Sequence, residues 1–382
     1  MKDVIIFAGS ALGSVLAIAR NIKEEFNTNC YVVCLNSKYT SAFSVSKFVT
    51  ESTNIIGITD DDLFENYKIW VAQKDFKAKP IVFFTTDISC LFADKYREWF
   101  ENHFLLTIPS SQILKTYNFK GVAENNAKEN GLIIPQTKLI NTVEDTILVT
   151  STFRFPVIIK PTSSKTKQSL GFKVKIIQKP QKFEDIAKQL IAEDKEFLCQ
   201  EYVPGNDKKV HYYIFYRDKH GMIWETMGIK TLQCPPNGGI MAKGISMYND
   251  KIEQMSRKFL DNINYTGIGG IEYKEYNGQY YFIEMSTRPE GFYLVSEKAE
   301  VPISTIVYKM LSGFPVDYKC QQKDGIKYID LLSTLIARKI SKKYFRLIID
   351  YFDAVFNPKT CINAFKLNDV MPFIKYLKLL FK

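Results

Sequence analysis

Histidine is the scarcest titratable residue of this 382-residue chain, which has only His103, His211 and His220. A metal centre built on histidine ligands is therefore not expected. The seven cysteines include no CxxC pair, so we expect reduced thiols in a cytoplasmic protein rather than a zinc site or a disulfide framework. No apolar run approaches the ~20 residues of a membrane span. No zinc finger, RNA-binding aromatic motif or arginine-rich arm indicates a nucleic-acid partner.

The common nucleotide and hydrolase motifs are also missing. The chain has no GxxxxGK[ST] loop, no kinase signature set and no GxSxG elbow. Gly9-x-x-x-Gly13 is not the dinucleotide-binding fingerprint and is explained better as a tight strand-to-helix turn. Asp3 and Arg20 flank the first apolar stretch, which favours a strand entering a helix over a secretory signal.

Residues 1–112 alternate apolar strands with amphipathic helices, which predicts a small open α/β domain with a parallel sheet. Strands are expected at Val4–Ala8, Tyr31–Leu35 and Ile81–Thr85. Asp87 follows the third strand at its carboxyl end, where open sheets bind ligands. A helix cap for the next segment explains the same residue equally well.

The stretch Gly267–Arg288 predicts a hairpin that carries one carboxylate on each strand, Glu272 and Glu284. A two-residue loop at Asn277-Gly278 would place the two acids on opposite faces. A three-residue loop that also includes Tyr276 would place them on one face, on a diagonal, close enough to share divalent cations. We expect the three-residue loop; the alternative is an ordinary edge hairpin with solvated acids.

Two lysines stand at the ends of expected elements. Lys120 lies near the start of a helix expected at Asn118–Asn130, and Lys160 ends a strand that begins at Phe155. Such a lysine is either solvated or a point charge for phosphate, and two of them on separate elements favour phosphate.

These segments, in this order over roughly residues 80–315, resemble the ATP-grasp superfamily. The resemblance is to its carboxylate–amine ligases, in particular D-aspartate ligase-like and carbamoyl-phosphate-synthase-like proteins. The family's metal signature, a strand Glu, a hairpin and Glu-x-Asn-x-Arg, stands here as Glu272 and then Glu284-Met285-Ser286-Thr287-Arg288. Ser286 replaces the usual Asn, and its hydroxyl can still ligate magnesium or orient a water that does.

The resemblance implies an α/β (α+β) ATP-grasp fold with three parts. They are a Rossmann-like domain at 1–112, the ATP-grasp domain at 113–318, and a helical, basic C-terminal extension at 319–382. The ATP-grasp domain would divide into a lid lobe at about 130–202 and a metal-binding lobe at about 203–318.

The resemblance also implies site residues and cofactors. Glu272, Glu284 and Ser286 would be the ligands of Mg²⁺ or Mn²⁺, and Lys120 and Lys160 would bind the phosphates of ATP. Glu201, Tyr202 and Val203 would form the adenine hinge, with Asp207 at the ribose. Arg288 and Lys230 would be catalytic, and Asp87 and Gln233 would contact the substrate. The loop Thr162–Gly171 would be a lid, with Ser163, Ser164 and Lys165 or Lys167 as phosphate donors.

The implied activity is an ADP-forming ligation of a small carboxylate to an amine through an acyl-phosphate, in cell-wall or surface-polysaccharide assembly. An ATP-grasp phosphotransferase and a catalytically decayed ATP-binding partner protein are the alternatives. A homodimer is one expectation for the assembly state.

Residues 319–382 hold 13 Lys and Arg against 5 Asp and Glu, within a net charge of +10 for the chain. Their last helix either packs on the protein's own core or makes a weak contact with the acidic inner face of a membrane.

Overall fold

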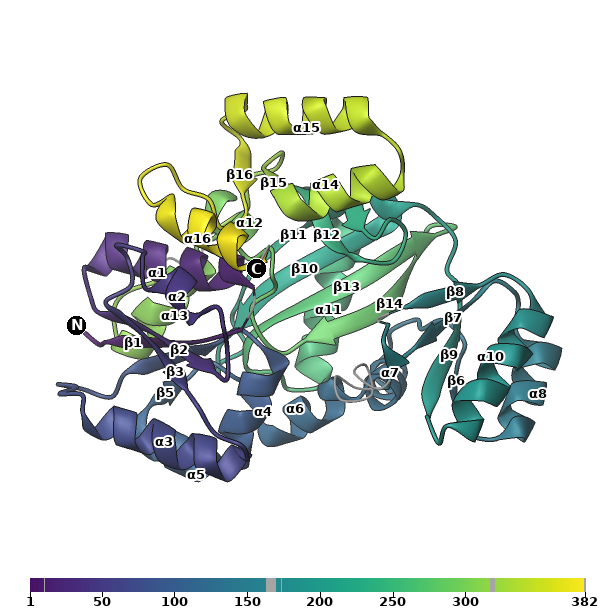
Figure 1. Cartoon of the computed structure of the whole chain (residues 1–382), viewed down its shortest axis with the longest axis horizontal. Helices are drawn as coiled ribbons and strands as arrows, with labels where there is room; N and C mark the ends of the chain where they lie inside the picture. Colours follow the sequence, from purple (N-terminus) through teal and green to yellow (C-terminus); the bar gives the residue numbers. More distant parts are fainter. Residues whose placement is uncertain (10, 163–169, 173, 317–319, 381–382) are drawn as a thin grey trace.

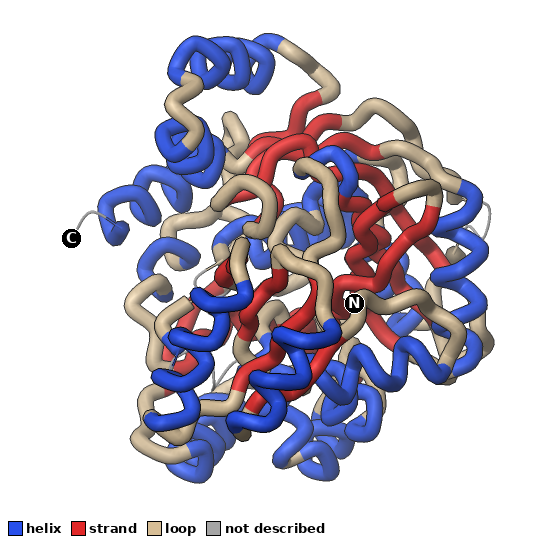
Figure 2. The backbone as a smooth tube through the Cα atoms, turned by 90° about the vertical axis from the view of Figure 1, so that its right-hand side faces the viewer, coloured by secondary structure: helices blue, strands red, loops and turns tan. Residues whose placement is uncertain are grey.

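The computed structural model describes residues 1–9, 11–162, 170–172, 174–316 and 320–380. Its strands form three sheets, and helices lie around them (Figures 1 and 2). The lid donors expected at Ser163, Ser164, Lys165 and Lys167 lie outside the described residues. Within the described residues, no helix is both long and apolar enough to cross a membrane.

The first sheet is parallel throughout, with strand order β3-β2-β1-β4-β5. Its strands are β1 (Val4–Ala8), β2 (Cys30–Leu35), β3 (Glu51–Ile55), β4 (Ile81–Phe84) and β5 (Leu105–Leu106). Every residue of β1 is buried, as expected for a parallel strand covered on both faces. The accompanying helices are α1 (Leu12–Phe26), α2 (Thr40–Phe43), α3 (Asp60–Ala72), α4 (Asp87–Lys95) and α5 (Arg97–His103). The α/β prediction for this part of the chain is confirmed.

The second sheet is small and antiparallel, with order β6-β9-β7-β8. Its strands are β6 (Thr137–Ile140), β7 (Val157–Lys160), β8 (Lys175–Ile177) and β9 (Phe197–Glu201). Helices α8 (Val143–Thr152) and α10 (Pro180–Ala192) pack on it through a compact cluster that includes Phe183 and Phe197. Figure 1 shows this lobe at the right edge of the molecule.

The third sheet has seven strands in the order β14-β13-β10-β11-β12-β15-β16. They are β10 (Val210–Arg217), β11 (Ile223–Cys234), β12 (Ile240–Ser246), β13 (Gly267–Tyr276), β14 (Gln279–Ser286), β15 (Lys327–Ile329) and β16 (Thr360–Ile362). The remaining helices are α6 (Ser111–Asn118), α7 (Lys120–Glu129), α11 (Asp250–Asn262), α12 (Leu294–Lys298), α13 (Ile303–Ser312), α14 (Leu331–Ile340), α15 (Tyr344–Phe356) and α16 (Met371–Leu380), with the short η1 (Asp207–Lys209).

One apolar core joins the first sheet to the third. Val15 of α1, Tyr212 of β10, Val307 of α13 and Tyr328 of β15 belong to the same buried cluster. The two sheets are therefore fixed against each other by packing, which gives the residues between them a defined geometry. The domain limits drawn at 112 and 318 stay a prediction.

The C-terminal region differs from the helical extension that was expected. Besides its helices it supplies β15 and β16, which extend the seven-stranded sheet. Three-residue strands are too short to show a period of two in the sequence, so the helical pattern around them dominated the prediction. The last helix, α16, packs on α2 beside the first sheet: the rings of Tyr376 and Tyr39, which precedes α2, lie 5.6 Å apart. Just before α16, buried Asp369 pairs with Arg20 at 2.9 Å.

Candidate active site

The hairpin β13–β14 turns at Asn277-Gly278. Both residues are left-handed, with φ of 50° and 75°, as a type I′ turn requires. Tyr276 pairs with Gln279, so the loop has two residues and the expected three-residue loop is wrong. The error has a physical reason, because the right-handed twist of the strands favours the tight primed turn.

A β-bulge nevertheless brings the two acids to one face. Tyr273 pairs with Phe282, but the next pair is Glu272 with Glu284, so Ile283 is an extra residue on its strand. Directly paired residues point to the same side of a sheet. The acids therefore share a face as expected, but they lie opposite each other rather than on a diagonal.

The donor set on this face suits a divalent cation. Ser286 pairs with Gly270, two residues along each strand, so its side chain lies on the same face as Glu284. Burial raises the pKa of Glu272, and the charges of Glu284 and Glu290 raise it further, while Lys230 lowers it. Two carboxylates and a hydroxyl match the way proteins hold Mg²⁺ together with substrate phosphates. In the described ranges no group of three or more His, Cys, Asp and Glu offers an all-protein metal cage.

Each acid is paired with a lysine from another element. Lys120 Nζ, at the start of α7, lies 3.2 Å from Glu284 Oε2. Lys230 Nζ, on β11, lies 2.5 Å from Glu272 Oε1, and both of these side chains are less than a tenth exposed. The structure therefore brings together residues from three separate stretches of the chain.

Lys160 has two partners that sequence analysis did not identify. Its ammonium, nearly inaccessible at the end of β7, pairs with buried Glu124 and donates to Gln200 Oε1 at 3.1 Å. Burial lowers the pKa of Lys160, against the opposing effect of Glu124. Glu124 follows Lys120 by four residues on α7, and this spacing was a usable signal that both point toward one site. Because Glu124 already neutralises the charge of Lys160, phosphate binding by Lys160 stays a prediction.

Asp87 and Arg288 are in direct contact, with 2.7 Å between Oδ1 and Nε. Thr86, not Asp87, caps α4, because its hydroxyl accepts the N–H of Ser89 at 3.1 Å. Asp87 is thereby left to face Arg288, which also lies 3.8 Å from Glu290. Burial lowers the pKa of Arg288, but the negative charges of Asp87 and Glu290 raise it by more, so the pKa of Arg288 lies above its ordinary value.

The predicted hinge lines a cavity of about 340 Å³. Glu201, Tyr202 and Val203 contribute to its wall, together with Tyr276 and Tyr281 of the acid hairpin. The N–H groups of Glu201 and Tyr202 donate to the carbonyls of Gln136 and Pro156, and the Glu201 carboxylate accepts from the Arg154 N–H at 2.8 Å. An adenine edge would therefore have to be read by the other backbone groups of the hinge.

Lys274 is a buried basic residue beside the hinge that sequence analysis missed. It lies two residues after Glu272 on β13, so the two side chains share a face. Its Nζ is 4.4 Å from the centroid of the Tyr202 ring and 3.3 Å from its hydroxyl. Burial lowers the pKa of Lys274 to about 8, with Asp207 acting in the opposite direction. The signal in the sequence was the placement of two charged residues, Glu272 and Lys274, at alternate positions of a largely apolar strand.

Asp207 and Gln233 have structural partners. The two carboxylate oxygens of Asp207 accept the N–H groups of Gln233 at 2.9 Å and Asn237 at 2.7 Å. The Gln233 amide donates to the Gly239 carbonyl at 2.5 Å. Both residues brace the loop after β11, and their predicted contacts with ribose and substrate stay predictions.

Comparison with known proteins gives two curated relatives. D-aspartate ligase of Enterococcus faecium is 29% identical over 147 residues, which are 36% of this chain and 35% of that protein. Formate-dependent phosphoribosylglycinamide formyltransferase of a Nitratiruptor species is 22% identical over 273 residues, 68% of this chain and 64% of that protein. The chain thus spans about one third of the first relative and just under two thirds of the second.

A solved structure shares the fold. The biotin carboxylase domain dimer of 2-oxoglutarate carboxylase from Hydrogenobacter thermophilus, crystallised with MgADP, ADP and bicarbonate, superimposes with a TM-score of 0.64. It is 16% identical, and the match covers 86% of this chain and 73% of that one.

The sequence profile described as "Carbamoyl-phosphate synthase L chain, ATP binding domain" matches residues 120–318, a little over half of the chain. The predicted cofactors, ATP and Mg²⁺, are confirmed at the level of this family, since the profile describes an ATP-binding domain and the solved neighbour holds MgADP. The chain therefore belongs to the ATP-grasp superfamily, in the family of the carbamoyl-phosphate synthase L chain ATP-binding domain.

Proposed function

We propose that this protein is an ADP-forming ligase that activates a small carboxylate as an acyl-phosphate and joins it to an amine. The observation that supports this proposal best is the pairing of Glu272 with Glu284 across the hairpin, with Lys230 and Lys120 beside them. The D-aspartate ligase relative favours an amino acid as the carboxylate.

In the proposed reaction a carboxylate oxygen attacks the γ-phosphorus of ATP, and the bond to the β-phosphate oxygen breaks to release ADP. The amine nitrogen then attacks the carbonyl carbon of the acyl-phosphate, and phosphate leaves with the electrons of the broken C–O bond. The amine loses its proton to solvent or to a substrate group. Because little covalent chemistry falls to the protein, its main tasks are positioning and charge neutralisation.

The site residues divide these tasks. Glu272, Glu284 and Ser286 would hold magnesium, which neutralises charge on the β- and γ-phosphates when bound. Lys120 and Lys160 would bind the α- and β-phosphates, and Lys160 would have to exchange its contact with Glu124 for phosphate. Arg288 would hold the transferred phosphate through its planar donor fork.

The remaining predicted residues would bind the substrates. Lys230 and Gln233 would face the acyl-phosphate and the acceptor, and Asp87 would lie beside the carboxylate substrate. Val203 and its neighbours in the hinge would contact adenine, and Asp207 the ribose.

A screen for ADP release over amino acids, with hydroxylamine as surrogate acceptor, tests the reaction. An acyl-phosphate intermediate gives a hydroxamate, whereas phosphate transfer without a hydroxamate would support the phosphotransferase alternative. ATP binding without magnesium-dependent turnover of any substrate would support the catalytically decayed alternative.

Glu284→Gln tests the metal assignment. Turnover should be abolished while nucleotide binding remains measurable, because the lysines are retained. Glu275→Gln on the same hairpin is the matched control, since its carboxylate pairs with Lys209 at 3.0 Å outside the acid pair. Activity that survives Glu284→Gln would show that the metal assignment is wrong.

The setting of the reaction is part of the same proposal. A cytoplasmic ligase for cell-wall or surface-polysaccharide assembly would take amine acceptors from that chemistry, so amino sugars and peptidyl amines belong in the acceptor screen. A homodimer, the state named for the solved neighbour, is testable by light scattering of the full chain.

A further inference from the structure

The helix α15 is attached to the protein by its polar side. Buried Asp350 accepts from Lys243 of β12 at 2.5 Å and from Arg338 of α14 at 2.7 Å. Asp353, one turn further along, pairs with Lys327 of β15 at 2.8 Å. A surface helix normally turns its apolar side inward, and here the orientation is reversed.

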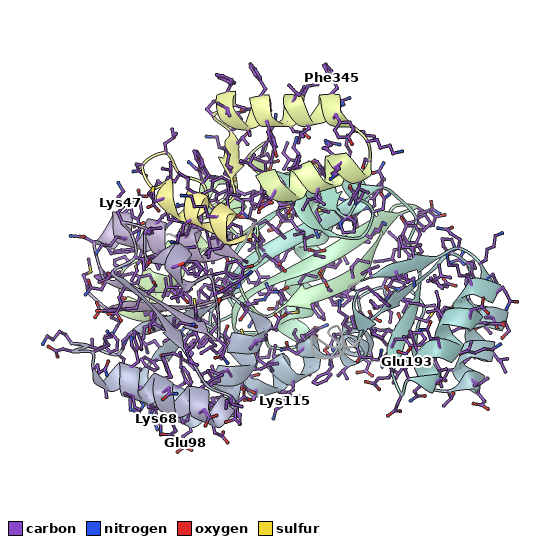
Figure 3. All side chains as sticks on the ribbon, viewed as in Figure 1. Lys47, Lys68, Glu98, Lys115, Glu193 and Phe345 are labelled. Carbon is purple, nitrogen blue, oxygen red and sulfur yellow. The ribbon has the colours of Figure 1, made fainter. Side chains whose placement is uncertain are left out.

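The outward side of α15 is a continuous apolar stripe. Its members lie three and four residues apart, are between 41% and 74% exposed, and are Phe345, Ile348, Ile349, Phe352, Val355 and Phe356. Figure 3 shows Phe345 at the outer edge of the molecule, pointing away from it. Figure 1 shows α15 as the outermost helix of this end of the protein. Neighbouring α14 adds Ile336 and Ile340, which are 50% and 57% exposed.

Scattered exposed apolar side chains are ordinary, but a contiguous stripe indicates a surface that is covered in use. The ion pairs that hold Asp350 and Asp353 prevent the helix from simply rotating its apolar side inward. The stripe therefore calls for a partner that accepts aromatic and aliphatic side chains.

The charges around the stripe identify the partner's chemistry. The exposed charged residues that border it in the sequence are all basic: Lys339, Lys342, Lys343, Arg346 and Lys359. The two acids of α15 face inward and are paired. Lys343 and Arg346 line a cavity of about 650 Å³ beneath the two helices together with Asp350 and Asp353, so the border of the stripe consists of Lys339, Lys342 and Lys359. An apolar surface with a purely cationic border complements an anionic lipid surface.

We propose that the α14–α15 face, defined by the stripe and these basic residues, docks on an anionic membrane. The phenylalanines would enter the boundary between headgroups and acyl chains, while Lys339, Lys342 and Lys359 lie at the level of the lipid phosphates. A second copy of this chain is a poorer occupant, because a two-fold contact would bring two identical cationic borders together. The membrane contact that was one of two alternatives for the last helix is thus assigned to α15, since α16 packs on α2.

Sedimentation of the full chain with lipid vesicles tests the proposal, and it needs no nucleotide or substrate, so its outcome is separate from that of the ligase assay. The chain should sediment with vesicles of phosphatidylcholine and phosphatidylglycerol, less with phosphatidylcholine alone, and less at high salt. Phe345→Gln with Phe352→Gln should weaken binding by about tenfold or more. Lys339→Gln with Lys342→Gln should weaken it by about fivefold per cation removed.

Matched controls lie on other elements. Leu367→Gln removes an apolar side chain that is 85% exposed, and Lys182→Gln removes an exposed cation of α10; both should leave binding unchanged. The proposal is overturned if the wild-type chain does not sediment with anionic vesicles, or if the controls reduce binding as much as the α15 variants. It is equally overturned if the phenylalanine variants convert a dimer to a monomer without changing sedimentation, which would assign the face to a second copy.

Discussion

Asp87 and Arg288 lie 201 residues apart in the sequence and 2.7 Å apart in the structure. The contact links the carboxyl end of the first sheet to the residue just beyond the acid hairpin. It fixes the Arg288 guanidinium of the proposed reaction centre against α4, beside the first sheet, so the orientation of Arg288 depends on both parts of the protein.

Asp87→Asn should lower kcat by about ten- to a hundredfold, because the amide no longer holds the guanidinium in place. The KM for ATP should change little, since the lysines at the phosphates are untouched. Asp94→Asn on the same helix is the control: Asp94 pairs with Arg97 at 2.8 Å, away from Arg288. Equal kcat values for the two variants would refute the positioning role of Asp87.

Deletion of Ile283 tests the bulge. Without this extra residue the strand alternates regularly after Phe282, so Glu272 still pairs with Glu284, and both acids and Ser286 keep one face of the hairpin. Magnesium-dependent ATP binding, measured by calorimetry, should therefore survive the deletion. Ile283→Val keeps the residue count and should bind nearly as well as wild type. Loss of magnesium-dependent binding in the deletion variant alone would show that the bulge itself, and not only the facing of the two acids, is needed at the site.

Lys160→Met should destabilise the protein by about 3 kcal/mol, because it leaves Glu124 charged, buried and without its partner. Adding Glu124→Leu should recover most of the loss, since a buried ion pair can be replaced by apolar side chains of similar size. Guanidinium unfolding monitored by circular dichroism measures both. Lys188→Met, which breaks the solvent-exposed pair with Glu184, should stay within about 0.5 kcal/mol of wild type.

Lys274 makes the free energy of unfolding depend on pH. Below its pKa of about 8 the lysine is charged in the folded and unfolded chains, so the full cost of burying the charge is present. From there to the ordinary lysine value of 10.5 the folded chain binds fewer protons than the unfolded one, so stability rises with pH.

Lys274→Met should therefore raise the free energy of unfolding at about pH 7 by roughly 1–2 kcal/mol, after allowance for the lost hydrogen bond to Tyr202. The gain should shrink as the pH approaches 10.5, where the wild-type lysine is neutral. Urea unfolding at both ends of this range measures it. A gain that grows with pH would show that Lys274 is not the group responsible.

The acid hairpin shows how far sequence reasoning reached. The two carboxylates and the hairpin are local features and were identified, but the two-residue Asn-Gly loop was not the one expected. The bulge was not identified, although Phe282 and Met285 carried its signal: both are buried in the cluster against α11, yet they stand three residues apart on one strand. An odd spacing between two core residues requires a break in the alternation of a strand.

The C-terminal region shows the opposite limit. The pattern of α15 predicts an amphipathic helix, and the helix is there, but the pattern does not say which side faces the protein. That orientation follows from Lys243, Arg338 and Lys327, which come from three other elements and reach the aspartates only after the sheet has formed.

The sequence by itself determined the superfamily, several strands and helices, and the positions of the acids and lysines along the chain, because periodicity and spacing are local properties. Only the tertiary structure decided which charged side chains form ion pairs: Asp87 with Arg288, Lys160 with Glu124, and Lys230 with Glu272. Such pairings depend on packing between segments distant in the chain, and burial gives them their strength.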